Sequence, residues 1–303
     1  MKEKTLLILA AGMGSRFGGL KQIEPVGPNK EFIIDYSIYD AKRTGFTKVV
    51  FVIKEENYEV FKETIGKRVE PYIKTEYVFQ DYKLVPEKYQ EEMQERTKPL
   101  GTGHAILCAK DKIKGAFSVI NADDFYGYDG YVTTSKYLDT IKEKEYGLVA
   151  YHLGNTLPPS GKAKRGVCWE DEDHNLVKLT ESKVEKEDNG IMISPLDNSK
   201  PFITSNDTLV SLNLFAFTSE LFNFLEEEFY KFLKQNEDNL STCEFLITEV
   251  LNDLIKRKEI KMKVLHTTAS WYGLTYKEDV DILKTALKEM IEKGEYPQEL
   301  WKK

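Results

Sequence analysis

The first half of the chain alternates short apolar runs with longer amphipathic stretches. The apolar runs predict strands at residues 5–10, 48–53, 75–79, 117–121 and 147–153. The amphipathic stretches predict helices at about 31–44, 57–66, 102–111 and 131–144. This alternation is typical of an α/β fold with a Rossmann-like, mostly parallel sheet and helices on both faces. Such a sheet binds its ligands at the carboxyl ends of the strands.

In the second half, predicted strands come first and predicted helices follow them. Strands are predicted near 165–170, 175–180 and 209–217, and the polar stretch 185–207 interrupts them. We expect these strands to form a small antiparallel layer beside the main sheet, where they wall a pocket. Helices are then predicted at about 219–235, 243–257 and 277–294.

Residues 81–98 interrupt the alternation of strands and helices in the first half. This segment is dense in charged residues, and Pro86 is placed to open a helix. We interpret the segment as a solvated helical excursion, and a specific regulatory element is the alternative.

Composition limits the partners of the chain. Its 303 residues are 41% hydrophobic, which is enough for a full core, and its net charge of −7 argues against nucleic-acid binding. The three cysteines are too widely spaced for a disulfide framework or a metal-binding motif. The N-terminal apolar run is too short for a membrane span and lacks a signal-peptide pattern. We therefore expect a cytoplasmic protein that binds no membrane.

Candidate chemistry begins where the first strand runs into a glycine-rich turn. Glycines there let backbone N–H groups approach phosphate oxygens. Arg16 can hold phosphate in a bidentate fork, and Lys21 acts as a mobile point charge. We expect a nucleoside triphosphate to bind beside these cations, at Ala10, Ala11, Gly12, Gly14 and Ser15.

Two related phosphate-binding motifs do not match this turn. A Walker A loop needs a lysine after its second glycine, where Leu20 follows Gly19 here. A dinucleotide fingerprint needs a glycine where Phe17 stands and an acid where Lys54 ends the second strand. A turn that only lets a helix pack on the sheet is the remaining alternative.

Two carboxylates follow the fourth strand, at Asp123 and Asp124. They lie at the same edge of the sheet as the glycine-rich turn. Mg²⁺ is usually held by one or two carboxylates together with substrate phosphates. Neighbouring strand residues point to opposite faces, so we expect Asp123 alone to hold the metal. A pair of capping or loop acids is the alternative.

A second glycine turn, at Gly101, Thr102 and Gly103, opens the helix before that strand. Its glycines would let a flat base lie against the backbone, and Gln80 could read the edge of that base. His104 has no carboxylate or cysteine partner nearby in the sequence. We therefore expect it to be a structural histidine, with a general base as the alternative. The other histidines are scattered and receive no role.

The segments 9–21, 99–105 and 120–123 together resemble those of the sugar-1-phosphate nucleotidyltransferases. The turn at 100–105 is most similar to that of the N-acetylglucosamine-1-phosphate uridylyltransferases. The resemblance extends over nearly the whole chain and implies one nucleotidyltransferase domain, GT-A-like, over 1–303. Its implied parts are a nucleotide-binding part at 1–154, a sugar-binding part at 155–218, and C-terminal helices with a closing strand at 219–303. No acetyltransferase β-helix follows.

The resemblance also implies roles for single residues. The counterpart of Lys21 contacts phosphate, that of Asp123 binds Mg²⁺, and a glutamine in the position of Gln80 contacts uracil. The sugar-binding counterparts are Gly166, Glu181 and Asn213.

Two motifs depart from the family pattern. Gly273 stands where many members carry a second metal ligand, and Thr275 or Asp279 would be weak substitutes. The sugar-site triplet is altered to Glu181-Ser182-Lys183, so Lys183 is the sugar-site residue whose role as a phosphate ligand stays open.

The implied reaction joins a nucleoside triphosphate, UTP in particular, to a sugar 1-phosphate such as an N-acetylhexosamine 1-phosphate, and it releases pyrophosphate. We expect catalysis by alignment and charge neutralisation through Arg16, Lys21, Asp123 and Mg²⁺, because an attacking phosphate needs no general base.

Other interpretations of the sequence stay open. One is a cytidylyltransferase for phosphocholine or a similar alcohol phosphate, with an aromatic cage formed by Tyr126, Tyr128, Trp169 and Trp271. Another is a nucleotide-sugar sensor without turnover. The sequence also leaves open the sugar and the oligomeric state, a homo-oligomer included.

Overall fold

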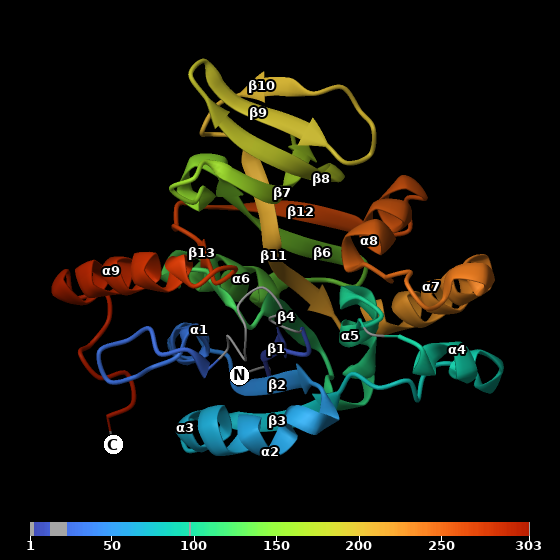
Figure 1. Cartoon of the computed structure of the whole chain (residues 1–303), viewed down its shortest axis with the longest axis horizontal. Coiled ribbons are helices and arrows are strands. Elements are labelled where there is room, and N and C mark those ends of the chain that lie inside the picture. The colour runs from blue at the N-terminus through green and yellow to red at the C-terminus, as the bar shows by residue number, and fades with distance from the viewer. Residues whose placement is uncertain (1–2, 13–22, 97, 303) are drawn as a thin grey trace.

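The computed structural model of the protein describes residues 3–12, 23–96 and 98–302 (Figure 1). Within these ranges, eleven strands form one large sheet. Its main path runs in the order β10-β9-β8-β7-β11-β4-β1-β2-β3, while β6 pairs with β11 and β12 pairs with β6. Two short strands, β5 and β13, pair with each other.

The strands of the sheet are β1 (Thr5–Leu9), β2 (Lys48–Ile53), β3 (Lys74–Phe79), β4 (Ala116–Asn121), β6 (Glu145–His152), β7 (Lys162–Glu170), β8 (Leu176–Glu187), β9 (Gly190–Pro195), β10 (Phe202–Thr204), β11 (Leu209–Thr218) and β12 (Lys261–Thr267). The separate pair is β5 (Asp124–Phe125) and β13 (Tyr272–Gly273). The helices are α1 (Ile33–Arg43), α2 (Tyr58–Phe61), α3 (Lys67–Val69), α4 (Gln90–Gln94), α5 (Thr102–Cys108), α6 (Tyr128–Thr140), α7 (Leu221–Gln235), α8 (Ile247–Lys256) and α9 (Glu278–Glu292).

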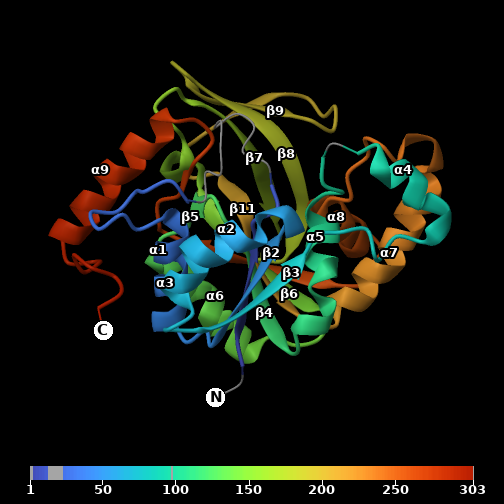
Figure 2. The ribbon, with the colours of Figure 1, turned by 60° about the horizontal axis from the view of Figure 1, so that its bottom comes forward.

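The parallel strands lie at the centre of the nucleotide-binding half. β1 pairs in parallel with β2 and β4, and β2 pairs in parallel with β3. Every residue of β2 is buried, as expected for a parallel strand covered on both faces. Leu7 packs in the core beneath α5, α7 and α8, while Leu6 and Ile8 pack beneath α1 and α6 (Figure 2). The predicted α/β class is therefore confirmed.

The antiparallel strands extend this same sheet outward from β11. β7, β8, β9 and β10 pair antiparallel in sequence order. The interruption predicted at 185–207 is wrong, because β8 continues to Glu187 and both β9 and β10 lie within it. Ile191 and Ile193 are buried and alternate with less buried neighbours, which is the pattern of a strand covered on one face. The surrounding polar residues hide that alternation in the sequence.

The predicted excursion at 81–98 is helical but also well anchored. A 3₁₀ turn begins after Pro86 and leads into α4, whose Met93 is buried. Arg96 is only 9% exposed. It donates to the carbonyl oxygens of Pro99 at 3.1 Å, Cys243 at 2.8 Å, Lys98 at 3.3 Å and also Leu240. This guanidinium fastens the excursion to the loop between α7 and α8.

Two buried acids of α1 receive partners from the far end of the chain. Asp35 pairs with Arg68 at 2.9 Å and accepts from Trp301 Nε1 at 2.8 Å. Asp40 accepts from the Tyr296 hydroxyl at 2.6 Å. Burial raises the pKa of Asp40 to about 7, although Arg43 and Tyr296 oppose the rise. Residues 296–301 thus complete the surroundings of the first helix.

Strands from the first two predicted parts and the C-terminal part all lie in this one sheet, and the boundaries between the parts stay predictions. Among the described residues, no helix has the length and apolar character needed to cross a membrane.

The anchoring of the excursion can be measured. Replacing Arg96 with methionine should lower the free energy of unfolding by roughly 1–3 kcal/mol, because buried carbonyl oxygens lose their donor. Urea denaturation followed by circular dichroism gives this value. Arg257→Met is the control, since Arg257 is exposed and pairs with Glu228 and Glu259 at the surface. Its loss should cost at most about 1 kcal/mol. Equal losses in the two variants would contradict the assignment.

Candidate active site

Three backbone hydrogen bonds align the carboxyl ends of the parallel strands. Ala10 N donates to Val52 O at 2.8 Å, Ala122 N donates to Leu9 O at 3.0 Å, and Gln80 N donates to Ile53 O at 2.9 Å. The start of the glycine-rich turn, the carboxylates after β4 and the glutamine after β3 therefore share one edge of the sheet. This common edge was predicted from the sequence, and the three hydrogen bonds agree with that prediction.

The glycine-rich turn itself is described only at its start. Ala10 and Ala11 are buried after β1, and Gly12 is exposed. Gly14, Ser15, Arg16 and Lys21 lie outside the described residues, so their phosphate-binding roles stay predictions.

Asp123 and Asp124 differ in their surroundings, as expected. Asp123 is half-buried and comes one residue after Ala122, at the aligned strand ends. Asp124 is 7% exposed, and its Oδ2 accepts from Asn121 Nδ2 at 2.9 Å and lies 3.2 Å from the Tyr126 hydroxyl. A half-exposed carboxylate supplies the hard oxygen donor that Mg²⁺ prefers, so Asp123 fits this cation. Asp124 is held within the protein.

The predicted position of a second metal ligand, Gly273, lies beside the two carboxylates. Gly273 pairs with Asp124 between β13 and β5, and Leu274 N donates to Asp123 O at 3.0 Å. Position 273 thus lies next to the two carboxylates but offers no side-chain ligand. Asp279 accepts from the backbone N–H groups of Thr275 and Tyr276, both at 2.7 Å, near the start of α9.

Gln80 and His104 form a small hydrogen-bonded group behind the second glycine turn. Gln80 Nε2 donates to Gly101 O at 3.1 Å and lies 3.3 Å from His104 Nδ1. Burial lowers the pKa of His104 to about 4, so its ring is neutral at pH 7. The expectation that no cysteine lies near His104 is wrong, because Cys108 Sγ is 3.7 Å from His104 Nε2. These buried contacts favour a structural histidine.

The glycines of this turn have a packing role. Gly101 adopts φ +103°, and a Cβ there would come within 2.6 Å of Phe245 O. Gly103 N donates to that same oxygen at 2.9 Å. The Thr102 hydroxyl accepts from Ile247 N at 3.1 Å. Packing against the segment before α8 therefore explains why small residues and a hydroxyl occur in this turn. Binding of a base at these residues stays a prediction.

Two of the four predicted sugar-binding residues pair across adjacent strands, and a third lies nearby on β11. Gly166 of β7 faces Glu181 of β8, and Ser211 of β11 faces Gly166 from the other side. Asn213 follows two residues later at φ +65°, where the pairing of β11 with β6 is irregular. A Cβ on Gly166 would come within 3.0 Å of Leu179 Cδ1, so the glycine accommodates close packing of that side chain. Desolvation raises the pKa of Glu181 against the opposing charges of Lys164 and Arg165.

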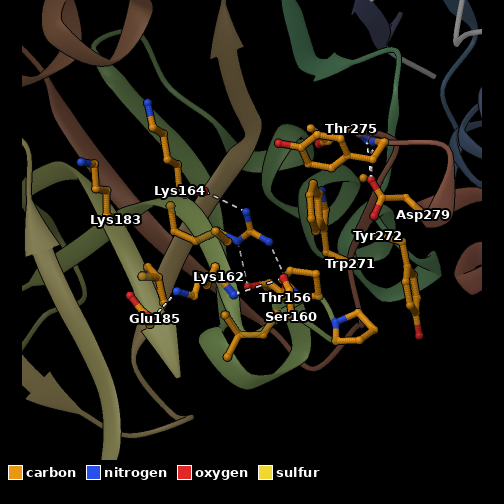
Figure 3. A pocket seen from close by; sticks show the side chains of 18 of the residues that line it. Thr156, Ser160, Lys162, Lys164, Lys183, Glu185, Trp271, Tyr272, Thr275 and Asp279 are labelled. Carbon is orange, nitrogen blue, oxygen red and sulfur yellow. Dashed lines mark hydrogen bonds and ion pairs between the residues drawn. The ribbon is translucent and has the colours of Figure 1, made fainter. Parts of the chain in front are cut away.

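A cavity of about 770 Å³ opens beside these strands (Figure 3). Cationic side chains line one wall, and Trp271, Tyr272, Gly273 and Tyr276 line another. The cations are Lys162, Lys164, Arg165 and Lys183. Gly273 also pairs with Asp124, so part of the lining lies beside one of the two carboxylates. Of the predicted sugar-binding residues, Lys183 lines this cavity.

Lys164 and Lys183 stand directly opposite each other in the antiparallel pairing of β7 and β8. Both are exposed, and Figure 3 shows their side chains extending in the same direction. Among the described residues, neither makes an ion pair within 4.0 Å. Like charges directly opposite on a sheet repel, so this arrangement favours an anion between them. Lys164 was not predicted from the sequence, because its position opposite Lys183 follows only from the register of β7 and β8.

Arg165 was also overlooked as a functional candidate. It is 8% exposed, donates to the Thr156 hydroxyl at 3.0 Å, and lies 4.5 Å from the centre of the Trp271 ring. Burial lowers its pKa to about 10, while Asp124 and Glu181 oppose the shift. Through its contact with Trp271, the Arg165 guanidinium connects the cationic wall of the cavity to the aromatic wall.

The aromatic cage of the phosphocholine alternative is not assembled. Tyr126 is fully buried in the core, Tyr128 stacks beneath Arg43 at 3.6 Å, and Trp169 pairs with Phe202. Trp271 lines the cavity, but Arg165 already covers its ring.

This chain belongs to the nucleotidyl transferase family, whose sequence model matches residues 5–274. The chain is thus a nucleotidyltransferase, and the resemblance found in its motifs is confirmed. No curated protein matches the sequence significantly.

Solved structures with the same fold agree with this membership. One from Bacillus anthracis, described as a glucose-1-phosphate thymidylyltransferase in complex with sucrose, has a TM-score of 0.63 and 15% identity, over 94% of this chain and 96% of that one. The inositol-1-phosphate CTP transferase from T. maritima has a TM-score of 0.61 and 14% identity, over 95% and 98%. A UDP-glucose pyrophosphorylase complexed with UDP-glucose has a TM-score of 0.57 and 18% identity, over 95% and 99%. At such identities the likeness establishes the fold alone.

The two carboxylates can be separated by mutation. Asp123→Asn should raise the Mg²⁺ concentration needed for half-maximal turnover and reduce the maximal rate, because the cation would lose a charged ligand. Asp124→Asn keeps an oxygen for Asn121 and should change the Mg²⁺ requirement less. Side-by-side Mg²⁺ titrations of pyrophosphate release measure both effects. The assignment is reversed if Asp124→Asn shifts the titration and Asp123→Asn does not.

Proposed function

We propose that this enzyme condenses a nucleoside triphosphate with a sugar 1-phosphate to give a nucleotide sugar and pyrophosphate. The observation that carries the acceptor assignment is the facing pair Lys164 and Lys183, which line the same cavity as Gly273. A phosphate group between them would relieve their mutual repulsion. Glu181, on the same strand as Lys183, supports a polyhydroxylated acceptor because a carboxylate accepts hydrogen bonds from hydroxyl groups.

In the proposed reaction, an oxygen of the acceptor phosphate attacks the α-phosphorus of the nucleotide. The bond from the α-phosphorus to the bridging oxygen breaks, and pyrophosphate leaves with the bonding electrons. Asp123 would hold Mg²⁺, which neutralises charge on the triphosphate when it is bound. Arg16 and Lys21 would stabilise the same charges, and Lys164 with Lys183 would align the acceptor. A reaction that uses these metabolites belongs in the cytoplasm.

The hydrogen bonds of Gln80 support a uracil or thymine base over cytosine. Its Nε2 donates to Gly101 O, so Oε1 is the atom available to a base. Uracil and thymine present an N3–H donor between two carbonyl groups, whereas cytosine presents an acceptor at N3. An accepting Oε1 therefore favours UTP, and dTTP is the next candidate.

A screen of pyrophosphate release tests the proposal. UTP, dTTP, CTP and GTP are each combined with a panel of sugar 1-phosphates, inositol 1-phosphate and phosphocholine. We expect turnover with UTP and at least one sugar 1-phosphate, and Lys21→Ala should reduce kcat by roughly 10²–10³. Lys183→Met should raise the KM for the acceptor and leave the KM for the nucleotide unchanged. Turnover with phosphocholine alone, or binding without turnover, would overturn the proposal.

The base preference has its own test. Gln80→Ala should lower kcat/KM for UTP by the equivalent of roughly 1–3 kcal/mol and narrow the gap to CTP, since a buried base edge loses its partner. Steady-state kinetics with both nucleotides measure the gap. Gln90→Ala is the matched control, because Gln90 also donates to a backbone carbonyl, Val85 O at 3.1 Å, but lies in the excursion. A preference for GTP in the unmodified enzyme would refute the assignment.

A further inference from the structure

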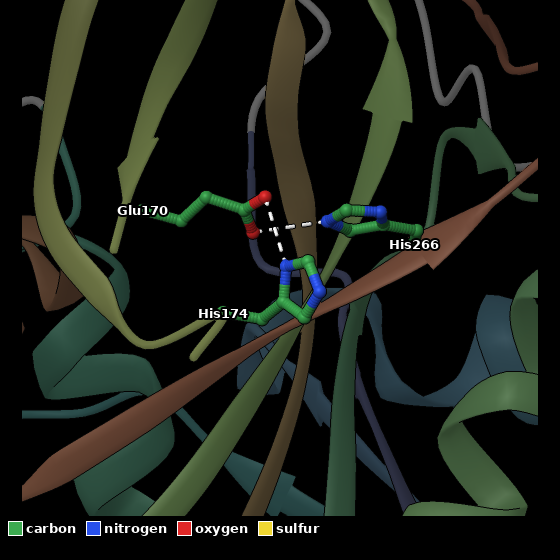
Figure 4. Close-up of side chains that lie close together, drawn as sticks. All are labelled: Glu170, His174 and His266. Atoms are coloured by element: carbon green, nitrogen blue, oxygen red, sulfur yellow. Dashed lines mark hydrogen bonds and ion pairs between the residues drawn. The ribbon is translucent and has the colours of Figure 1, made fainter. Parts of the chain in front are cut away.

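Two histidines that received no role from the sequence meet at one carboxylate, away from the residues assigned to catalysis (Figure 4). Glu170 ends β7, His174 lies in the turn that follows, and His266 lies on β12. His174 Nδ1 is 3.1 Å from Glu170 Oε1, and His266 Nε2 is 2.9 Å from Glu170 Oε2. Their candidate ligand atoms all lie within 4.8 Å of one another.

From this cluster we propose a binding site for a divalent transition-metal ion of the Zn²⁺ class, held by Glu170, His174 and His266. Two imidazole nitrogens and one carboxylate form a donor set that suits Zn²⁺ and disfavours Mg²⁺ and Ca²⁺, which take oxygen ligands. The cluster is therefore distinct in chemistry from the site proposed at Asp123.

The observed spacing is close to what coordination requires. With bonds of about 2.0–2.2 Å, neighbouring ligands on a tetrahedral ion lie about 3.3–3.6 Å apart. The nitrogen-to-oxygen distances of 3.1 and 2.9 Å run to the two different oxygens of Glu170, and one ligand atom from each residue lies within 4.8 Å of the others, so modest side-chain adjustment brings the three into this range. Each imidazole would carry its proton on the nitrogen that faces away from the ion, so binding replaces two hydrogen bonds with two metal bonds.

The backbone around the cluster is already organised. Asp171 Oδ1 accepts from Asp173 N at 3.0 Å and Asn175 N at 2.8 Å, which shapes the turn. Val264 N donates to His174 O at 2.9 Å, and this bond fastens the turn to β12. His174 adopts φ +58° within this turn. The turn that carries His174 is thus positioned by hydrogen bonds that do not involve the histidine side chain.

Charge and exposure also suit a cation. The Glu170 carboxylate lies between the two imidazoles, 3.1 and 2.9 Å from their nitrogens, and supplies the negative charge of the cluster. Acidic residues continue at 171–173. The side chains of His174 and His266 are 61% and 42% exposed, which leaves an open path and room for water as a fourth ligand.

Competition with a chromophoric zinc chelator tests the proposal on the full chain after metal removal. We expect one Zn²⁺ per chain, with affinity weakened at least about tenfold in His174→Ala and in His266→Ala. His152→Ala is the matched control, because His152 lies outside the cluster beside Asp207 O and should bind Zn²⁺ normally. Asp123→Asn should also bind normally, which separates this site from the proposed catalytic one.

A second measurement identifies the ligands. Co²⁺ bound at this site should show intense visible absorption typical of a four-coordinate ion, and the bands should disappear in the two cluster variants. Zn²⁺ should raise the melting temperature of the unmodified protein but not of His174→Ala, because the ion would cross-link the turn to β12. The proposal is overturned if no Zn²⁺ binds, if the cluster variants bind like the unmodified protein, or if Asp123→Asn abolishes binding.

Discussion

The register of β1 between β2 and β4 is the constraint on which the rest of the site depends. Leu9 faces Val52 on one side and Asn121 on the other, so the three strands end at the same level. A shift by one residue would turn Leu7 away from one core and Leu6 away from the other. It would also carry Asp123 away from the glycine-rich turn. The hydrophobic packing of both faces therefore sets the relative position of the polar groups at the edge.

Features that depend on neighbouring residues could be predicted from the sequence. β2 occupies the predicted range 48–53, because a short apolar run of that length is typical of a fully buried strand. Asp124 is more buried than Asp123, as predicted, but strand alternation is not the cause, because β4 ends at Asn121 and a turn separates it from Asp124 of β5. The hairpin of β9 and β10 could not be predicted, since only Ile191 and Ile193 mark the covered face among many polar residues.

Features that depend on distant pairing were missed for a different reason. The proposed anion-binding role of Lys164 depends on Lys183, which lies opposite it in the sheet. The anchoring role of Arg96 depends on hydrogen bonds to carbonyl groups such as that of Cys243. His266 and Glu170 are separated by 96 residues. No local pattern distinguishes such residues from solvated surface charges. The net charge of −7 likewise gives no hint that cations gather at one cavity, because total charge carries no information on position.

The partners of Asp35 and Asp40 have a consequence for how the chain folds during synthesis. Trp301 and Tyr296 are 266 and 256 residues away from the carboxylates that they contact. The ribosome delivers both residues after every described strand of the sheet, so Asp35 and Asp40 have only Arg68 and Arg43 as charged partners until then. Contacts of such long range slow the final stage of folding. The surroundings of α1 are therefore completed only after the strands of the sheet have been synthesised.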